Sequence, residues 1–209
     1  MKRKKHNSCF YKSHGYRYFY PAALLLALVG LWLVCYQTYH YTRSRHALKS
    51  YAEEPSFSDS YDALPDNEAQ LLYFNRPEQG ARFGELSIPK LDLKLPIYEG
   101  TGSNELALGV GHYIGSVLPG EKDNCILSGH RNTVFQELGK VGKGDTLLVT
   151  TDAGQFKYIV DKVRIVDKDD RTVIVPRPRA TLTVSTCYPF VYVGAAPKRY
   201  ILVAHLAID

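Results

Sequence analysis

The sequence contains few cysteines, and their positions do not form a disulfide framework. Only four occur in 209 residues, namely Cys9, Cys35, Cys125 and Cys187. The first two lie before or inside a long apolar segment, so only Cys125 and Cys187 share the rest of the chain. A bond between these two stays open here, because spacing alone does not give disulfide geometry. A free thiol in such a domain is explained by burial, by pairing with another chain or by reactivity.

Nucleic-acid-binding signatures are also missing. The sequence has no helix-turn-helix pattern, no RNA-binding sheet signature and no zinc module. The formal net charge of +5 would suit a nucleic-acid partner, but six cations precede residue 20 with no acid among them. The positive excess therefore belongs largely to the first residues, and we expect no nucleic-acid partner. These cations are Lys2, Arg3, Lys4, Lys5, Lys12 and Arg17.

Only one long apolar run is present, and residues 18–39 contain no charged side chain. Their number suits a membrane-spanning helix of about 20 residues. The cations before this run outnumber the three that follow it, which predicts a cytoplasmic basic tail over residues 1–17 and an extracytoplasmic location for the rest. The alternative is a cleaved secretory signal. The bulky residues after the apolar core do not form a small-residue cleavage site, so an uncleaved signal anchor is favoured.

Residues 40–80 are polar and contain several prolines, which predicts an extracytoplasmic spacer, and the composition changes near Ala81. Beyond it, short apolar or alternating runs are separated by glycine- and proline-containing turns. Helical patterns are short and occur at residues 103–108 and 133–138. Many short strands without long crossover helices indicate a mainly β domain over residues 81–209, built as a closed or nearly closed, mainly antiparallel barrel. The predicted strands are residues 83–88, 93–98, 125–128, 146–150, 156–166, 181–186 and 200–206.

A thiol stands at the end of one predicted strand. The run 181–186 leads to Cys187 and stops at Pro189. Arg199 opens the next apolar run, so pairing of the two strands would place Cys187 and Arg199 at one rim of the sheet. As a functional pair, Cys187 would be a nucleophile and Arg199 a hydrogen-bond donor to an oxyanion, since arginine stays protonated. The alternatives are a buried small hydrophobe and a solvated strand-end cation.

Two histidines follow glycines and are candidates for proton transfer. His130 comes just after a predicted strand and Gly129, at a loop mouth where it could exchange a proton with Cys187. His112 is the second candidate, in a similar context. For either residue the alternative is a structural histidine with local hydrogen bonds.

An acidic cluster offers oxygen ligands of the kind that calcium prefers. Asp167, Asp169 and Asp170 form it, but Lys168 and Arg171 dilute its charge. A solvated turn is therefore favoured, and neither a metal nor another cofactor is expected to be required.

These motifs together resemble the sortase family. Thr183-Val-Ser-Thr-Cys187 is similar to the sortase Thr-Leu-x-Thr-Cys signature, with Val184 in place of leucine. Ser-Gly-His130-Arg resembles the segment that carries the sortase histidine, and Lys198-Arg199-Tyr200 resembles the strand that carries its arginine. The resemblance covers about residues 81–208, and the segment from Gly109 to His130 looks most like class D.

The resemblance implies an eight-stranded sortase barrel with short helices, preceded by one N-terminal transmembrane helix. Cys187 would attack the bond after threonine in a Leu-Pro-x-Thr sorting signal, His130 would protonate the leaving amine, and Arg199 would stabilise the oxyanion. Thr186, Tyr188 and His112 are implied to contact the signal.

The implied partners are secreted proteins with a C-terminal sorting signal and an amine of a peptidoglycan precursor, in a Gram-positive-type envelope. Two other classes stay open beside this one. The chain could be another extracytoplasmic cysteine peptidase or an L,D-transpeptidase, or it could be a non-catalytic, anchored β-barrel that binds a partner.

Overall fold

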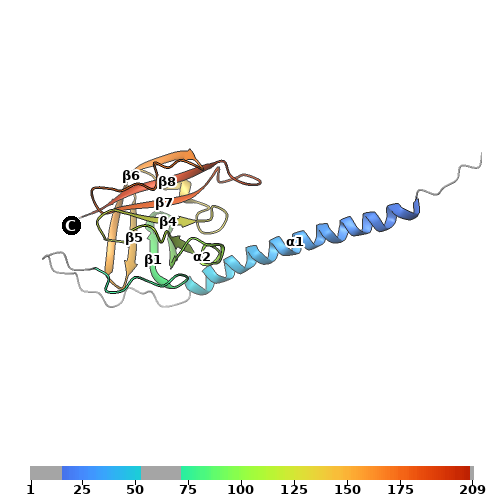
Figure 1. Ribbon diagram of the computed structural model, residues 1–209, viewed down its shortest axis with the longest axis horizontal. Coiled ribbons are helices and arrows are strands. Elements are labelled where there is room, and N and C mark those ends of the chain that lie inside the picture. Colours follow the sequence, from blue (N-terminus) through green and yellow to red (C-terminus); the bar gives the residue numbers. More distant parts are fainter. Residues whose placement is uncertain (1–15, 53–71, 208–209) are drawn as a thin grey trace, which may run out of the picture. The chain divides into compact units, whose positions relative to one another are not determined.

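The computed structural model describes residues 16–52 and 72–207 (Figure 1). Residues 1–15, 53–71 and 208–209 lie outside the described part. Nearly all of the predicted basic tail, and much of the predicted spacer, therefore fall where the structure gives no description. The chain divides into two units at Thr42 and Arg43, and each unit is described by itself.

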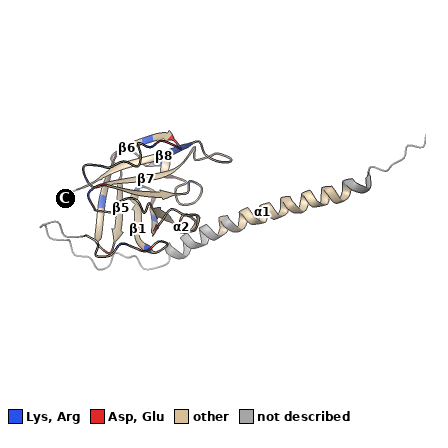
Figure 2. Ribbon diagram, viewed as in Figure 1, with Lys and Arg blue, Asp and Glu red and all other residues tan. Residues whose placement is uncertain are grey.

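The first unit consists mainly of one helix, α1 (Tyr16–Ala52). Its segment Tyr20–Tyr39 is long and apolar enough to cross a membrane, judged by length and composition. Side chains such as Leu26 and Trp32 are more than 60% exposed, and Figure 2 shows no Lys, Arg, Asp or Glu on the described part of this helix. A surface so apolar is unfavourable in water, which is consistent with the predicted membrane anchor.

The second unit is a closed barrel of eight strands in the order β1-β2-β3-β4-β7-β8-β6-β5 (Figure 1). Six neighbouring pairs are antiparallel, while β2–β3 and β4–β7 are parallel. The structure thus confirms the closed, mainly antiparallel barrel. The strands are β1 (Arg82–Ile88), β2 (Leu93–Glu99), β3 (Val110–His112), β4 (Asn124–Gly129), β5 (Thr146–Thr151), β6 (Gly154–Asp167), β7 (Thr181–Tyr188) and β8 (Lys198–Leu206).

The helices of this unit are short. The predicted helix at residues 103–108 is confirmed as α2 (Ser103–Leu108), and single 3-10 turns occur at η1 (Pro89–Leu91) and η2 (Leu138–Lys140). The helix predicted at residues 133–138 is wrong. Residues 131–137 form turns instead, in which the amide of Phe135 donates to the carbonyl of His130. This tighter path tucks Val134 and Phe135 into the core, and burial there outweighs helical propensity.

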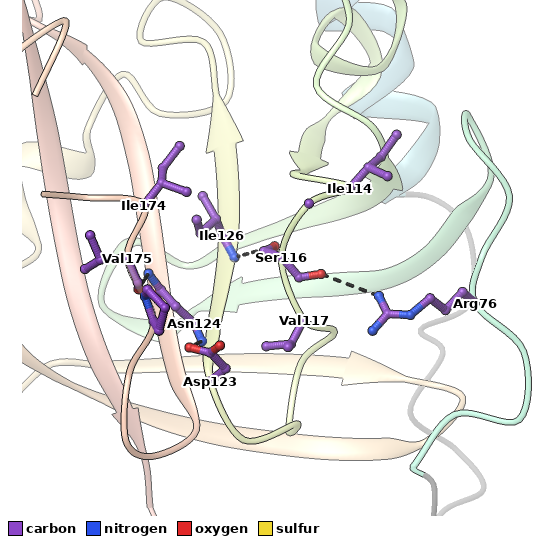
Figure 3. Close-up of a pocket in the computed structure, with 11 residues that line it drawn as sticks. Arg76, Ile114, Ser116, Val117, Asp123, Asn124, Ile126, Ile174 and Val175 are labelled. Atoms are coloured by element: carbon purple, nitrogen blue, oxygen red, sulfur yellow. Dashed lines mark hydrogen bonds between the residues drawn. The ribbon is translucent and has the colours of Figure 1, made fainter. Parts of the chain in front are cut away.

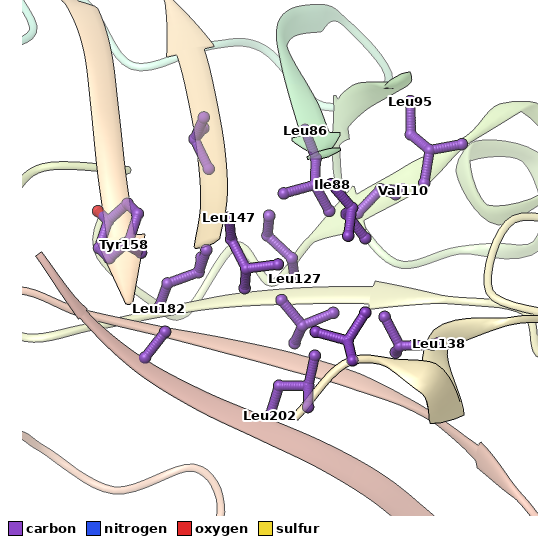
Figure 4. Close-up of a cluster of buried hydrophobic side chains, with 14 of the residues drawn as sticks. Leu86, Ile88, Leu95, Val110, Leu127, Leu138, Leu147, Tyr158, Leu182 and Leu202 are labelled. Carbon is purple, nitrogen blue, oxygen red and sulfur yellow. The ribbon is translucent and has the colours of Figure 1, made fainter. Parts of the chain in front are cut away.

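The main hydrophobic core fills the barrel (Figure 4). Each large side chain that is fully buried contributes roughly 1.5–3 kcal/mol to the free energy of unfolding. Alternation along β7 sends Leu182 and Val184 inward, so every second residue of this strand is left for the outer face. Core residues that Figure 4 labels are Leu86, Ile88, Leu95, Val110, Leu127, Leu138, Leu147, Tyr158, Leu182 and Leu202.

Candidate active site

Three neighbouring strands bring Cys187, His130 and Arg199 into one row at one end of the barrel. In the parallel β4–β7 pair Gly129 lies opposite Thr186, so the residues that follow each of them, His130 and Cys187, leave the sheet side by side. In the antiparallel β7–β8 pair Cys187 lies directly opposite Arg199. The structure therefore assembles the three sequence candidates from separate parts of the chain.

The row continues into a cavity of about 160 Å³ on the outer face of the sheet. Ser185 precedes Cys187 by two residues and so faces the same side, and both Ser185 and Arg199 line this cavity. Ser128 and Ile201, the register partners of Ser185, complete its floor. The β6–β7 loop forms its other wall with Val173 and Ile174. A half-buried thiol thus stands at the end of a groove that could hold an extended segment.

Thr186 and Gly129 fix the backbone beside the row. The buried hydroxyl of Thr186 donates to the carbonyl of Gly129 at 2.8 Å. A Cβ on Gly129 would come within 2.5 Å of the Phe135 ring and 2.6 Å of Val134. Only glycine therefore lets the 131–137 turn pack over the end of β4. Thr186, predicted from the resemblance as a substrate contact, here uses its hydroxyl hydrogen within the sheet.

His130 is set up to accept a proton. Its side chain is exposed, yet partial desolvation by its surroundings lowers the pKa of His130 below the ordinary histidine value. Within residues 72–207 the ring makes no hydrogen bond that would fix its tautomer. A neutral imidazole at pH 7 can take a proton from a thiol and return it to an amine.

Arg199 is half-buried and held by the backbone around it. Its Nη1 donates to the carbonyls of Ala196 at 3.2 Å and Lys198 at 3.0 Å. A guanidinium has five N–H donors, and these two bonds engage only one of its nitrogens. The remaining donors are chemically suited to a developing oxyanion.

Arg131 links the His130 turn to the β7–β8 loop, a role that the sequence did not indicate. Its Nη1 donates to the carbonyl of Pro189 at 3.2 Å, and its Nη2 donates to those of Tyr192 at 2.8 Å and Gly194 at 3.2 Å. Its guanidinium carbon also lies 5.7 Å from the centre of the Tyr192 ring. The only sequence signal was an arginine beside a candidate histidine, which is equally typical of a solvated loop.

Asn124 was also missed, and it fastens the groove wall. Its Nδ2 donates to the carbonyls of Val173 at 3.2 Å and Val175 at 3.0 Å. Its Oδ1 accepts the Thr183 hydroxyl at 2.7 Å. One buried amide therefore joins β4, β7 and the β6–β7 loop, and the wall is held in place by the chain itself.

The structure does not bring His112 to the row. Its side chain is fully buried, with Nδ1 at 2.7 Å from Glu99 Oε2. Nε2 lies 3.0 Å from both the Val117 carbonyl and the Ser116 hydroxyl. With both ring nitrogens engaged and no exposure, His112 supports the barrel in this structure rather than contacting a substrate.

Tyr188 is half-buried and packs against other rings. The centroids of Phe190 and Tyr200 lie 5.7 Å and 6.3 Å from its own. In this structure Tyr188 therefore faces aromatic partners of the chain, on the opposite side of β7 from Cys187.

Cys125 and Cys187 are both free thiols, which rejects the disulfide left open by the sequence. Cys125 lies opposite Leu182, five residues before Cys187. It is 1% exposed, and burial raises the pKa of its thiol. The thiolate, the reactive form, is therefore suppressed at Cys125.

The carboxylates of the 167–170 turn are used by neighbouring groups. Asp170 Oδ1 accepts the amide and the hydroxyl of Thr172 at 2.7 Å and 2.6 Å, and Oδ2 lies 3.4 Å from Arg164. These hydrogen bonds lower the pKa of Asp170. Among the residues that the structure describes, no group of three His, Cys, Asp or Glu is placed to hold a metal ion.

Comparison with known proteins agrees with this geometry. A family model described as "Sortase domain" matches residues 86–207. The chain is 48% identical over 128 residues to Sortase D of Bacillus subtilis (strain 168), covering 61% of this chain and 65% of that one. It is 26% identical over 201 residues to Sortase A of Streptococcus agalactiae, covering 84% and 81%.

Solved structures give the same result. The catalytic domain of B. anthracis SrtD matches with a TM-score of 0.55 and 38% identity, covering 68% of this chain and 95% of that one. Sortase A from Corynebacterium diphtheriae matches with a TM-score of 0.57 and 31% identity, covering 64% of each chain. The chain spans just under two thirds of the Sortase D that it matches. It belongs to the sortase family and is most similar to class D.

Proposed function

We propose that this chain is a membrane-anchored cysteine transpeptidase that joins secreted proteins to an amine of the cell wall. The observation that carries the proposal is the row of Cys187, His130 and Arg199 on β4, β7 and β8. Membership of the sortase family supports the same reaction class. The substrate is a protein with a C-terminal Leu-Pro-x-Thr sorting signal, and the acceptor is an amine of a peptidoglycan precursor.

In the first step, the Cys187 sulfur attacks the carbonyl carbon of threonine while His130 takes the thiol proton. Arg199 donates hydrogen bonds to the oxyanion. The carbon–nitrogen bond then breaks, and His130 gives its proton to the leaving amine, which produces a thioester on Cys187. Proton transfer by a positioned histidine accelerates such a step by about 10²–10⁴-fold, and one oxyanion donor by about 10²–10³-fold.

In the second step, the acceptor amine attacks the thioester carbonyl and forms a new amide. The amine proton passes through His130 to the departing sulfur, which restores the thiol. Because the leaving amine departs and the acceptor enters at the open rim beside His130, the acylated half of the substrate is the half held in the groove. Water in place of the amine would give hydrolysis.

The membrane topology follows from charge. The cations before residues 18–39 outnumber those that follow, which favours a cytoplasmic N-terminus and an extracytoplasmic barrel. The anchor then keeps the active site near substrates that emerge from the membrane. We propose that the reaction needs no metal or other cofactor.

Product analysis tests the proposal. The domain would be incubated with Leu-Pro-x-Thr-Ala peptides of varied x, with and without an amine acceptor, beside Cys187→Ala. We expect cleavage after threonine and, with the amine, an amide product, both absent in Cys187→Ala. Hydrolysis that no amine diverts would indicate a cysteine peptidase. A chain that neither cleaves nor reacts with thiol reagents at Cys187 would be a binding module.

A further inference from the structure

A second and larger cavity, of about 500 Å³, adjoins the one at Arg199 (Figure 3). Both are lined by Ile126 and Ile174, so they form one groove along the outer face of β4. Figure 3 shows Ile126 and Asn124 on β4, with Arg76 reaching toward Ser116 from a separate segment. The lining residues are Arg76, Ile114, Gly115, Ser116, Val117, Asp123, Asn124, Ile126, Ile174, Val175 and Pro176.

The length of a sorting signal ends at the boundary between the two cavities. Ile126 lies opposite Thr183, four residues before Cys187 on β7. At about 3.3 Å per residue, this distance is roughly 13 Å. An extended segment of four residues spans about the same length. With threonine at Cys187, the leucine of Leu-Pro-x-Thr therefore reaches Ile126, and the residue before it enters the larger cavity.

The chemistry of the larger cavity favours an apolar side chain. Its polar side chains are already engaged, since Asn124 makes three hydrogen bonds and the Ser116 hydroxyl accepts the amide of Ile126. Asp123 Oδ1 accepts two backbone amides, from Asn124 and Arg177. The groups left for a ligand are mainly aliphatic, and Ile114 and Ile174 are 51% and 55% exposed.

We propose that this cavity is an additional substrate subsite, which binds an apolar residue immediately before the Leu-Pro-x-Thr motif. The inference rests on the proposed transpeptidase function and adds a specificity element to it. Substrates would then be distinguished by the residue that precedes the signal as well as by the signal itself. Burying an aliphatic side chain stabilises the bound substrate at about 25 cal/mol per Å², enough for a preference of about five- to tenfold.

The test uses two peptides that differ only in the residue before the motif, valine or glycine. We expect kcat/KM to be about five- to tenfold higher for valine in the wild type. Ile114→Ser, which changes only the larger cavity, should reduce this preference to less than about twofold and leave the glycine peptide unaffected. Ile165→Ser is the matched control, because Ile165 is 49% exposed and lines neither cavity. It should keep the preference.

The outcomes separate this inference from the function on which it rests. Equal kcat/KM for the two peptides in the wild type would overturn the subsite while leaving the transpeptidase intact. A preference that Ile114→Ser does not reduce would also overturn it. Cleavage of neither peptide would overturn both proposals.

Discussion

His112 and His130 both follow a glycine and both lie beside β4, yet they differ in every property that matters for catalysis. His112 is fully buried and hydrogen-bonded at both ring nitrogens. His130 is exposed, and its ring has no such partner among residues 72–207. Parallel pairing of β2 with β3 brings Glu99 beside His112, and the β3–β4 loop covers it. Tertiary structure therefore decides which glycine–histidine pair is structural and which is available to a substrate.

The same contrast separates the two ends of β4. At its beginning, Asn124 has its polar atoms satisfied within the protein. At its end, His130 and the half-buried Cys187 offer groups to a ligand. Buried polar groups must be paired to avoid a large cost, so reactivity is confined to the rim where water and substrate can enter.

The largest effect is expected from His130→Ala. Loss of the proton-transfer group should lower kcat/KM for transfer by about 10²–10⁴-fold, with little change in thermal stability because the side chain is exposed. NMR titration of the wild-type ring should give a pKa below about 6.5, as its partial desolvation requires. Full turnover in His130→Ala would remove this residue from the mechanism.

His112→Ala should show the opposite pattern. It leaves Glu99 buried without its partner, which costs about 1–3 kcal/mol in the free energy of unfolding. Activity per folded molecule should stay within about threefold of wild type. His205→Ala is the control, because its pair with Asp161 is partly exposed and should be worth less than about 1 kcal/mol. Denaturant unfolding measures both, and a large loss of activity in folded His112→Ala would contradict the comparison.

Arg131→Gln should lower kcat about tenfold through the position of the His130 turn and the β7–β8 loop. The variant loses three hydrogen bonds to that loop, while Cys187 should still react with a small thiol reagent at the wild-type rate. Arg131→Lys should not restore activity, because a single ammonium cannot replace the planar fork. Rescue by lysine would indicate that only charge matters. Arg171→Gln, at an exposed position, is the control.

The smallest effect is expected from calcium. Asp170 is already hydrogen-bonded to Thr172 and near Arg164, and Asn124 fastens the β6–β7 loop. A chelator should therefore change the transfer rate by less than about twofold. A strong loss of rate on chelation, restored by calcium, would show that the loop needs a metal after all.

Much of the fold could be predicted because local patterns agree with it. Seven of the eight strands carry clear alternating or β-branched runs, such as the one that ends at Cys187. β3 was missed because Val110–His112 has only three residues and a central glycine, and it exists through its two neighbours. The 131–137 turn was misread because its apolar residues fit a helix until packing over Gly129 is known.

The candidate site divides in the same way. Cys187, His130 and Arg199 could be named because a nucleophile, a proton carrier and a fixed cation are recognisable by residue type and position at element ends. Asn124 and Arg131 could not, because their hydrogen bonds join segments about 50–70 residues apart in sequence. A long-range bond to a backbone carbonyl leaves no pattern in the sequence around its donor.

The most direct test of the account is intact-protein mass spectrometry of the enzyme during reaction with a Leu-Pro-x-Thr-Ala peptide. The account predicts a covalent adduct with the mass of the peptide up to threonine, mapped to Cys187, absent in Cys187→Ala and removed when an amine is added. Cys125, buried and with a raised thiol pKa, should stay unmodified. An adduct that persists in Cys187→Ala, or cleavage of the peptide without any adduct at Cys187 under rapid quenching, would contradict the proposed thioester mechanism.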